Sequence, residues 1–483
     1  MIRTTLSLIV LLVTPLLLAG CSTNAATGKQ QFTALMSPAQ ENQIGASEHQ
    51  KIAAQFGFYE NPTVTAYVNE IGRKVSANTE NPDVKYKFYV LDSPIVNAFA
   101  LPGGYIYFSR GLLALANSEA EVAAVMAHEV GHITGRHSAE RYSRSAVTAL
   151  GANILSIALD NGAASQALGL GANLYLSSYS RSQENESDTL GLRYMTRAGY
   201  HPEAMASFLS SLHAQSALDS KIDGKKNQGT SYFSTHPATG ERVNKTHTEA
   251  KQYPNIGTVN RDHHMSMING LTYGDSVKQG FTRGQKFYHP EIGFAFEAPA
   301  GYKIINQPSQ VVAQSERDKA AMVFDMAANK GKLDAVTYLN QIWMKGENIQ
   351  TTQPITINGM KAATATFSGH VNGRRADIRL IAIEFKPDSI ARFQIAIPKD
   401  ASATTVENLK RASYSFRKLT QQERRTLKPQ RIKIVTARAG DSVAGMANKM
   451  AYDDLKLERF RTLNALVPGE ELKAGQTYKI VVY

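Results

Sequence analysis

The run His128-Glu129-Val130-Gly131-His132 constrains the fold of this chain more than any other stretch. It lies in a segment with helical apolar spacing that opens at Ser118, with a glutamate three residues later, the S-x-x-E pattern of a capping box. On a helix, histidines four positions apart share one face at about 6 Å, so both imidazoles can bind one tetrahedral Zn²⁺. Glu129 points about 100° away, where it can reach a water on that metal. The run therefore predicts a buried metal-binding helix.

A catalytic zinc site needs a third protein ligand and an open fourth position. The chain has one cysteine in 483 residues, which excludes intramolecular disulfides, cysteine-based zinc fingers and iron–sulfur clusters. A second helix, expected over 181–197, offers Glu184, Glu186 and Asp188. Glu184 and Asp188 are four apart and share a face, whereas Glu186 points roughly the opposite way and is expected to be solvated. Spacing favours Glu184 but leaves the other two open.

Sequence blocks within and around the two helices add to this pattern. Four blocks occur in order: NAFALPGGYIYFSRGLL (97–113), HEVGHITGRH (128–137), SYSRSQENESDTLGLRYMTRAGYHP (178–202) and STHPATGERV (234–243). With them, residues 38–250 resemble the HtpX/CAAX-prenyl-endopeptidase family of zinc metallopeptidases (gluzincins), in particular its soluble periplasmic BepA-like lipoprotein members. The resemblance implies hydrolysis of peptide bonds with one Zn²⁺ per chain.

The resemblance also implies the metal ligands. The family's E-x-x-A-D pattern falls on Glu184-Asn185-Glu186-Ser187-Asp188, with a serine where alanine is usual. Glu184 is then the expected third ligand beside His128 and His132. Asp188 is expected to hydrogen-bond a ligand histidine and to fix its tautomer.

Three further residues have expected roles in the reaction. Glu129 is the expected general base, which takes a proton from water and delivers it to the leaving amine. His236 and Arg242, six residues apart, match a family pair whose implied role is to stabilise the transition state, and the resemblance also implies a latent form in which His236 closes the zinc's free position. The alternative for His236 is a histidine in an ordinary loop. Other histidines lack a spacing argument and are expected to be solvated or structural: His137, His201 and His247.

A strand with a possible role in substrate binding follows the Gly-Gly turn. Gly104, Tyr105, Ile106 and Tyr107 read as the start of an edge strand that pairs with an extended substrate by β-augmentation. The alternative, an internal strand, fits the residues as well, and the family pattern favours the edge. Such a site would select unfolded polypeptides rather than one fixed sequence.

The first residues read as an export signal. Residues 1–20 hold Arg3 and an apolar run, and they end in Leu-Ala-Gly before Cys21, which resembles a bacterial lipobox. Cys21 is therefore the expected lipidation site; the alternative is a plain signal peptide. Ser22, in place of an aspartate, implies an outer-membrane lipoprotein that faces the periplasm of a Gram-negative envelope. For an exported chain, the net charge of +12 points to anionic envelope surfaces and not to nucleic acid.

The segment order predicts a multidomain α+β protein. Seven segments are expected: a lipoprotein signal peptide (1–20), a tether (21–37), a mainly helical gluzincin domain with a small β-sheet (38–255), a linker (256–285), an α+β domain of unknown role (286–418), a basic linker (419–431) and a small, self-contained LysM-like βαβ module (432–483). The last segment resembles LysM through Gly440-Asp441 and Leu463-Asn464, which implies peptidoglycan binding. A packing domain without a ligand is the alternative.

The sequence thus predicts a zinc endopeptidase that acts on unfolded or misassembled envelope proteins. The alternative function is a periplasmic chaperone or scaffold for outer-membrane assembly, with latent or secondary proteolysis. An intact metal-binding pattern with its adjacent base favours the peptidase, because a scaffold needs neither.

Overall fold

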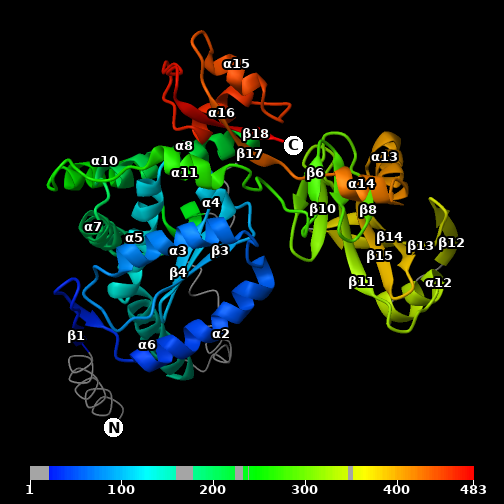
Figure 1. Cartoon of the computed structure of the whole chain (residues 1–483). Coiled ribbons are helices and arrows are strands. Elements are labelled where there is room, and N and C mark those ends of the chain that lie inside the picture. Colours follow the sequence, from blue (N-terminus) through cyan, green and yellow to red (C-terminus); the bar gives the residue numbers. More distant parts are fainter. Residues whose placement is uncertain (1–20, 159–177, 224–231, 238, 346–351, 372) are drawn as a thin grey trace. The chain divides into compact units, whose positions relative to one another are not determined.

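The computed structural model describes residues 21–483 except 159–177, 224–231, 238, 346–351 and 372. It divides into two compact units (Figure 1). The first combines Met1–Tyr273 with Gln430–Tyr483, and the second is Gly274–Pro429. The expected signal peptide lies outside the described residues. None of the helices in the described part combines the length and the apolar character needed to cross a membrane.

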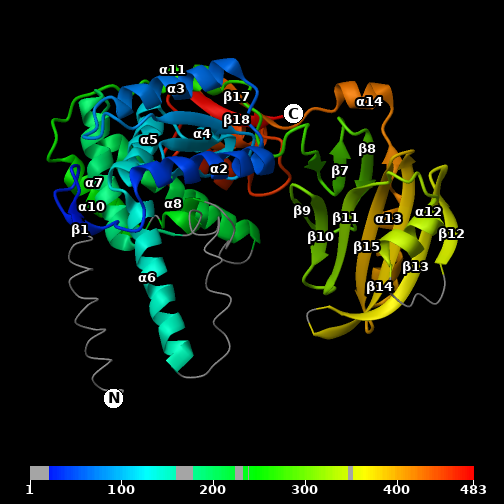
Figure 2. The same ribbon diagram turned by 90° about the horizontal axis from the view of Figure 1, so that it is seen from below.

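Helices dominate the first unit, as the sequence predicts. Its first elements are β1 (Cys21–Thr23), β2 (Gln30–Phe32), α2 (Pro38–Phe56), α3 (Pro62–Ser76), β3 (Lys87–Leu91), β4 (Ala98–Leu101), β5 (Tyr105–Ser109), α4 (Arg110–Leu115) and α5 (Glu119–Thr134). The next are α6 (His137–Ala158), α7 (Arg181–Arg197), α8 (Glu203–Asp223), α9 (Tyr232–Thr235), α10 (Gly240–Ala250) and α11 (Arg261–Ile268). The C-terminal elements are β17 (Arg431–Thr436), α15 (Val443–Asn448), α16 (Lys456–Leu463) and β18 (Thr477–Val482). Figure 2 shows α6 projecting from the other helices of this unit.

Helix α5 is almost entirely buried, which its alanine- and valine-rich sequence permits. The Ser118 side chain accepts a hydrogen bond from the Glu121 backbone N–H, as the S-x-x-E pattern predicts. The Glu121 carboxylate, however, accepts from the backbone N–H of Asn117 and not from that of Ser118. The expected capping box is therefore half formed, and the carboxylate fixes the chain one residue before the helix cap.

The small sheet of this unit has the order β3-β5-β4, so β5 is its central strand. It runs parallel to β3 and antiparallel to β4. The prediction that Tyr105 to Tyr107 form an edge strand is therefore wrong. Both faces of β5 are buried: Ile106 and Phe108 lie in the main core, whereas Tyr105 and Tyr107 lie in an aromatic cluster on the other face. Side-chain alternation cannot distinguish an edge from a central strand when both faces are covered.

The segment expected to be a tether is a docked hairpin, formed by β1 and β2. Cys21 is its first residue. The Asn24 amide donates to the Thr134 carbonyl at 2.9 Å, and the Gln31 amide donates to the Gly135 carbonyl at 2.6 Å. These carbonyls close α5 and would otherwise lack partners, because the last turn of a helix leaves its carbonyls unpaired. The hairpin thus caps the metal-binding helix.

The C-terminal region also belongs to the first unit and is not self-contained. Its order is β17-α15-α16-β18, with antiparallel strands. It therefore has two helices between the strands, where the expected βαβ order has one. Ile432 and Phe460 lie in the same hydrophobic core as α5. The buried Lys479 ammonium donates to the three backbone carbonyls of residues 114–116. The LysM resemblance stays a prediction.

The second unit is rich in strands. Its elements are β6 (Phe281–Arg283), β7 (Lys286–His289), β8 (Phe294–Glu297), β9 (Lys303–Asn306), β10 (Gln310–Ser315), β11 (Ala320–Ala328), α12 (Ala335–Tyr338), the π-helix η3 (Leu339–Trp343), β12 (Thr352–Ile357), β13 (Met360–Val371), β14 (Arg374–Lys386), β15 (Ser389–Pro398), α13 (Ala403–Tyr414), β16 (Arg417–Lys418) and α14 (Gln421–Thr426). An antiparallel sheet of order β12-β13-β14-β15-β11-β10-β9 and a second sheet of order β16-β8-β7-β6 enclose a phenylalanine-rich core.

The second unit is α+β, as expected, but it is wider than the predicted 286–418. It takes in the C-terminal part of the expected linker 256–285 and most of the expected basic linker 419–431. The N-terminal part of the expected linker 256–285 contains α11, which contributes Met265 and Ile268 to the core of the first unit. Both linkers therefore contain ordered secondary structure.

Candidate metal centre

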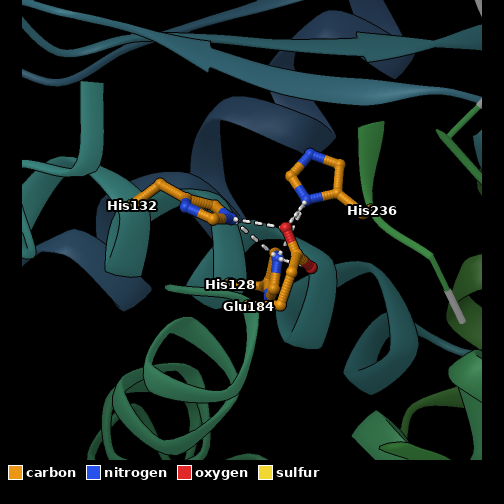
Figure 3. Close-up of side chains that lie close together, drawn as sticks. All are labelled: His128, His132, Glu184 and His236. Atoms are coloured by element: carbon orange, nitrogen blue, oxygen red, sulfur yellow. Dashed lines mark hydrogen bonds and ion pairs between the residues drawn. The ribbon is translucent and has the colours of Figure 1, made fainter. Parts of the chain in front are cut away.

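Four buried side chains converge in the first unit (Figure 3). His128 and His132 come from α5, Glu184 comes from α7, and His236 directly follows α9. One ligand atom of each lies within 4.8 Å of the ligand atoms of the other three. The two histidine Nε2 atoms are 3.0 Å apart, and each lies 3.6 Å from a Glu184 carboxylate oxygen. The structure thus brings together the three predicted ligands and adds His236 to them.

The close approach of α5 and α7 rests on small residues. A Cβ at Gly131 would lie 2.8 Å from the Ser187 hydroxyl oxygen, and a Cβ at Gly191 would lie 3.1 Å from the His128 backbone nitrogen. Larger side chains there would separate the two ligand helices. The Ser187 hydroxyl also donates to the His128 carbonyl at 2.8 Å. The serine that replaces the usual alanine therefore ties α7 to α5.

Asp188 contacts His128, as the resemblance implies. Its Oδ1 lies 2.8 Å from His128 Nδ1. Because an ionised carboxylate only accepts, the proton of the neutral imidazole is assigned to Nδ1, which leaves Nε2 free to face the cluster. Arg242 donates to both Asp188 oxygens at 2.6 and 2.7 Å. Burial alone would raise the pKa of Asp188, but the charge of Arg242 outweighs it and holds that pKa well below its usual range.

The Arg242 guanidinium also contacts a predicted ligand. Its Nη1 lies 2.7 Å from Glu184 Oε2. Burial would raise the pKa of Glu184, yet the charges of His236 and Arg242 overcome this effect and lower it. The structure therefore places Arg242 where it keeps two carboxylates ionised. Its expected contact with the transition state stays a prediction.

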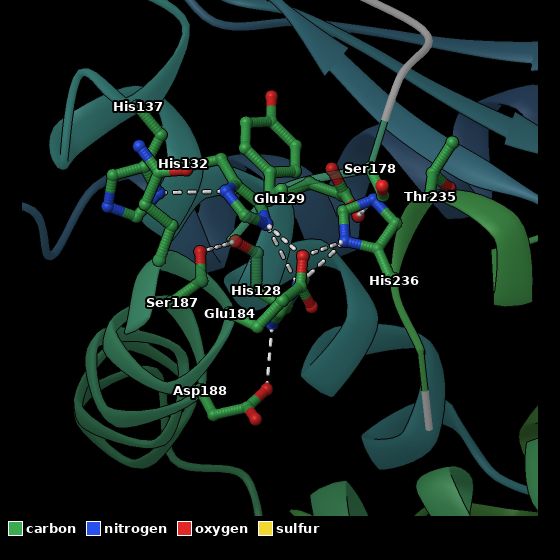
Figure 4. Close-up of polar contacts among 12 residues, drawn as sticks. His128, Glu129, His132, His137, Ser178, Glu184, Ser187, Asp188, Thr235 and His236 are labelled. Carbon is green, nitrogen blue, oxygen red and sulfur yellow. Dashed lines mark hydrogen bonds and ion pairs between the residues drawn. The ribbon is translucent and has the colours of Figure 1, made fainter. Parts of the chain in front are cut away.

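Glu129 lies beside the cluster in Figure 4, and its side chain is completely buried. Neither of its carboxylate oxygens has a hydrogen-bond partner among the described residues. Burial is the main cause that raises the pKa of Glu129, against the opposing charge of His236. A buried carboxylate without a hydrogen-bond partner is costly. Such a carboxylate is suited to act as the proton acceptor of the site.

His236 lies inside the cluster and not at its rim. Its Nδ1 is 2.8 Å from Glu184 Oε1 and 3.3 Å from His128 Nε2, and its Nε2 is 3.6 Å from Glu129 Oε1. Burial would lower the pKa of His236, but the carboxylates of Glu184 and Glu129 raise it. The alternative of a histidine in an ordinary loop is therefore wrong. A set of two imidazole Nε2 atoms and one carboxylate fits Zn²⁺, with His236 as a fourth donor.

Two residues near the cluster were not expected there. His137 Nδ1 lies 2.8 Å from His132 Nδ1, and Glu186 Oε2 lies 3.0 Å from His137 Nε2. The expectation that Glu186 is solvated is wrong, since its side chain is 12% exposed. The Glu186 carboxylate is partly shielded from water, because His137 and Lys29 contact its two oxygens at 3.0 and 2.6 Å. The available signal was the third histidine of HEVGHITGRH, His137, five residues after His132.

A pocket of about 690 Å³ opens beside the cluster and reaches His132 and Tyr179. The Tyr179 ring stacks on the His132 ring, with 3.8 Å between centroids. Of the residues expected to bind substrate, Tyr105 lines this pocket, whereas Ile106 and Tyr107 are fully buried in the sheet. The two outer strands of the sheet, one on each side of β5, are β3 and β4.

Comparison with known proteins agrees with this geometry. Residues 62–250 match the family model for peptidase family M48. The chain is 30% identical over 228 residues to a beta-barrel assembly-enhancing protease of Yersinia pestis, which covers 45% of this chain and 46% of that protein. It is 31% identical over 240 residues to a putative beta-barrel assembly-enhancing protease of Vibrio cholerae, which covers 47% and 48%.

A mitochondrial protein is also similar to part of this chain. The chain is 29% identical over 209 residues to the mitochondrial metalloendopeptidase OMA1 of Schizosaccharomyces pombe, which covers 42% of this chain and 59% of that protein. The chain thus spans about half the length of the curated relatives that it matches. Residues 62–250, which carry all four side chains of the cluster, form a peptidase family M48 domain.

Proposed function

We propose that this chain is a zinc-dependent endopeptidase that hydrolyses peptide bonds of unfolded or misassembled envelope proteins. One observation carries the proposal. His128, His132 and Glu184 present three ligand atoms to one centre, next to the Glu129 carboxylate, which has no hydrogen-bond partner among the described residues. Ligands and base therefore stand together in a buried site, as a metal-dependent hydrolase requires.

The residues divide the reaction between them. When bound by His128, His132 and Glu184, Zn²⁺ would polarise the scissile carbonyl and lower the pKa of water to about 7. Glu129 accepts the proton of the attacking water and transfers it to the leaving amine, a task for which its raised pKa suits it. His236 donates to the oxyanion once it has left the ligand cluster, a role worth about 3 kcal/mol per donor.

The position of His236 supports a latent state. A fourth protein ligand is typical of closed structural zinc sites, whereas catalytic sites keep one position open. His236 Nδ1 lies among the ligand atoms, at 2.8 Å from Glu184. Hydrolysis therefore requires that His236 withdraws. This observation also favours the second candidate function, a periplasmic chaperone or scaffold for outer-membrane assembly with latent proteolysis.

We place this activity at the periplasmic face of the outer membrane, with Cys21 acylated after removal of residues 1–20. The lipobox-like sequence and the names of the two bacterial relatives support the location and the role in quality control. The proposed partners are unfolded polypeptides and, through the lipid, the membrane. Peptidoglycan binding by residues 432–483 stays a prediction, and no nucleic-acid partner is proposed.

Casein degradation tests the proposal. The wild type should degrade casein, a chelator should stop degradation, and Glu129→Gln should retain bound zinc but lose hydrolysis, because the amide cannot accept the proton. Wild-type turnover by Glu129→Gln would contradict the assignment. If the chain acts mainly as a scaffold, Glu129→Gln should still support outer-membrane assembly in cells that lack the wild-type protein.

A further inference from the structure

The two ligand histidines of α5 differ in what lies behind them. His128 has the carboxylate of Asp188 at its Nδ1, whereas His132 has another imidazole, that of His137 (Figure 4). The 2.8 Å between the Nδ1 atoms of His132 and His137 is a hydrogen-bond distance. Glu186 lies beyond, with its Oε2 3.0 Å from His137 Nε2. A chain of contacts therefore leads from a predicted ligand to a carboxylate on α7.

The Glu186 carboxylate, at the end of this series of contacts, determines which nitrogen carries the hydrogen in each contact. The ionised carboxylate of Glu186 has no proton and can only accept, so His137 Nε2 must carry a hydrogen. The Nδ1 of a neutral His137 is then an acceptor, and the hydrogen between the two rings belongs to His132 Nδ1. This tautomer leaves the lone pair of His132 Nε2 free, on the side where the cluster lies.

The backbone is shaped to bring His137 back against His132. Arg136 has a φ of 50°, a left-handed conformation that is uncommon for a residue other than glycine. Its guanidinium donates to the Thr33 hydroxyl at 3.1 Å and to the Met36 carbonyl at 2.8 Å, which holds the turn. A Cβ at Gly135 would lie 2.6 Å from His137 Nε2, so the ring packs directly on that glycine.

We propose that His137 and Glu186 are positioning residues that fix the tautomer and orientation of His132, as Asp188 does for His128. The inference rests on the proposed zinc site. His137 is completely buried, and the Glu186 side chain is 12% exposed, so water does not substitute freely for either contact. Lys29 lies 2.6 Å from the other Glu186 oxygen, but its own side chain is 68% exposed, and an exposed ion pair contributes little.

The competing explanation is that His137 only fills space beneath His132. The two explanations rank substitutions differently. Asn at position 137 places its carbonyl oxygen near the position of the lost Nδ1 and can still accept from His132, although it fills less space. Leu fills more of the space but cannot accept. Positioning therefore predicts that Asn is the milder substitution, whereas packing predicts that Leu is.

Zinc affinity, measured by chelator competition on the full chain, decides between them. We expect His137→Leu to weaken zinc binding by about 10- to 100-fold, the range for a lost partner of a ligand histidine. His137→Asn should stay within about 3-fold of the wild type, and Glu186→Ala should fall between the two. Because Glu186 acts through His137, adding Glu186→Ala to His137→Leu should cause no further loss.

Equal zinc affinity in the wild type, His137→Leu and Glu186→Ala would overturn the proposal, as would a milder loss for Leu than for Asn. Thermal unfolding in excess chelator serves as the folding control. Should His137→Leu not fold, Glu186→Ala decides alone, and an unchanged affinity would count against the proposal. A wild type without zinc affinity would instead overturn the proposed function, and this inference with it.

Discussion

Two arginine–aspartate pairs of nearly identical geometry lie in the two units of this chain. Arg242 donates to both oxygens of Asp188 at 2.6 and 2.7 Å, and Arg392 donates to both oxygens of Asp325 at 2.6 Å. The first pair is 6% and 3% exposed, whereas the second is 23% and 26% exposed. Removal of one partner should therefore cost more stability in the buried pair than in the exposed pair, because a buried charge that loses its partner cannot be rehydrated.

The two units also differ in the charged side chains that they bury. In the described part of the second unit, the buried polar side chains carry no fixed charge: Ser276, His289, Ser315, Asn329, Thr364 and Ser413. The described part of the first unit buries nine acidic, arginine or lysine side chains beyond its histidines: Asp92, Arg110, Glu119, Glu121, Glu129, Glu184, Asp188, Arg242 and Lys479. Buried charges are costly and persist where chemistry needs them. The comparison locates the chemistry in the first unit.

The largest effect is expected from Arg242→Met. The substitution keeps most of the apolar stem but leaves Asp188 and Glu184 as buried carboxylates without their cation. We expect a loss of about 3–5 kcal/mol in the free energy of unfolding of the first unit. Hydrogen exchange of amides in α5 and α7 would report it, with amides of β14 as an internal control. A loss below about 1 kcal/mol would contradict the contrast between the units.

The second-largest loss of stability is expected from Lys479→Met. The ammonium group donates to the three carbonyls of residues 114–116, and burial is the main cause that holds its pKa well below the usual value. Its removal should cost about 3 kcal/mol, since buried carbonyls lose their donor. Denaturant unfolding should show the loss in the first unit. Lys433→Met, on the neighbouring strand and exposed, is the matched control.

The pH dependence of the second unit should be smaller. Burial lowers the pKa of His289 from 6.5 to about 4, so the unfolded chain takes up this proton before the folded one does. Stability should therefore be complete above pH 6.5 and should fall by about 2 kcal/mol between pH 6.5 and pH 5. Hydrogen exchange of β14 and β15 amides would measure it. The same slope in His289→Gln would refute this cause.

Arg392→Met should have the smallest effect. Because Arg392 and Asp325 both reach water, we expect at most about 1 kcal/mol in the second unit and no change in hydrolysis. Denaturant unfolding and casein degradation would test both parts. A cost equal to that of Arg242→Met would show that exposure does not separate the two pairs.

The sequence predicts the features that depend on neighbouring residues. Ser118 caps α5, the two histidines four apart share its inner face, and Glu184 lies one turn before Asp188 on α7. Spacing on one helix cannot say what covers its other face, so the contact of Glu186 with His137 was missed. The position of His236 in the cluster came from family resemblance and not from periodicity.

Features that depend on distant segments were mispredicted or absent. The strand partners of β5 depend on β3 and β4, whose positions no local pattern fixes. Lys479 contacts carbonyls more than 360 residues earlier in the chain, and composition gives no sign of such a contact. For the same reason, the tether and the C-terminal module looked independent, although both pack on the first unit.

Anomalous X-ray scattering at the zinc edge, from crystals of the protein purified with zinc, tests the central claim most directly. The account predicts one full-occupancy peak in the first unit, about 2.0–2.1 Å from the Nε2 atoms of His128 and His132 and within about 2.2 Å of a Glu184 oxygen. No peak there, or a peak bound by other residues, would contradict it.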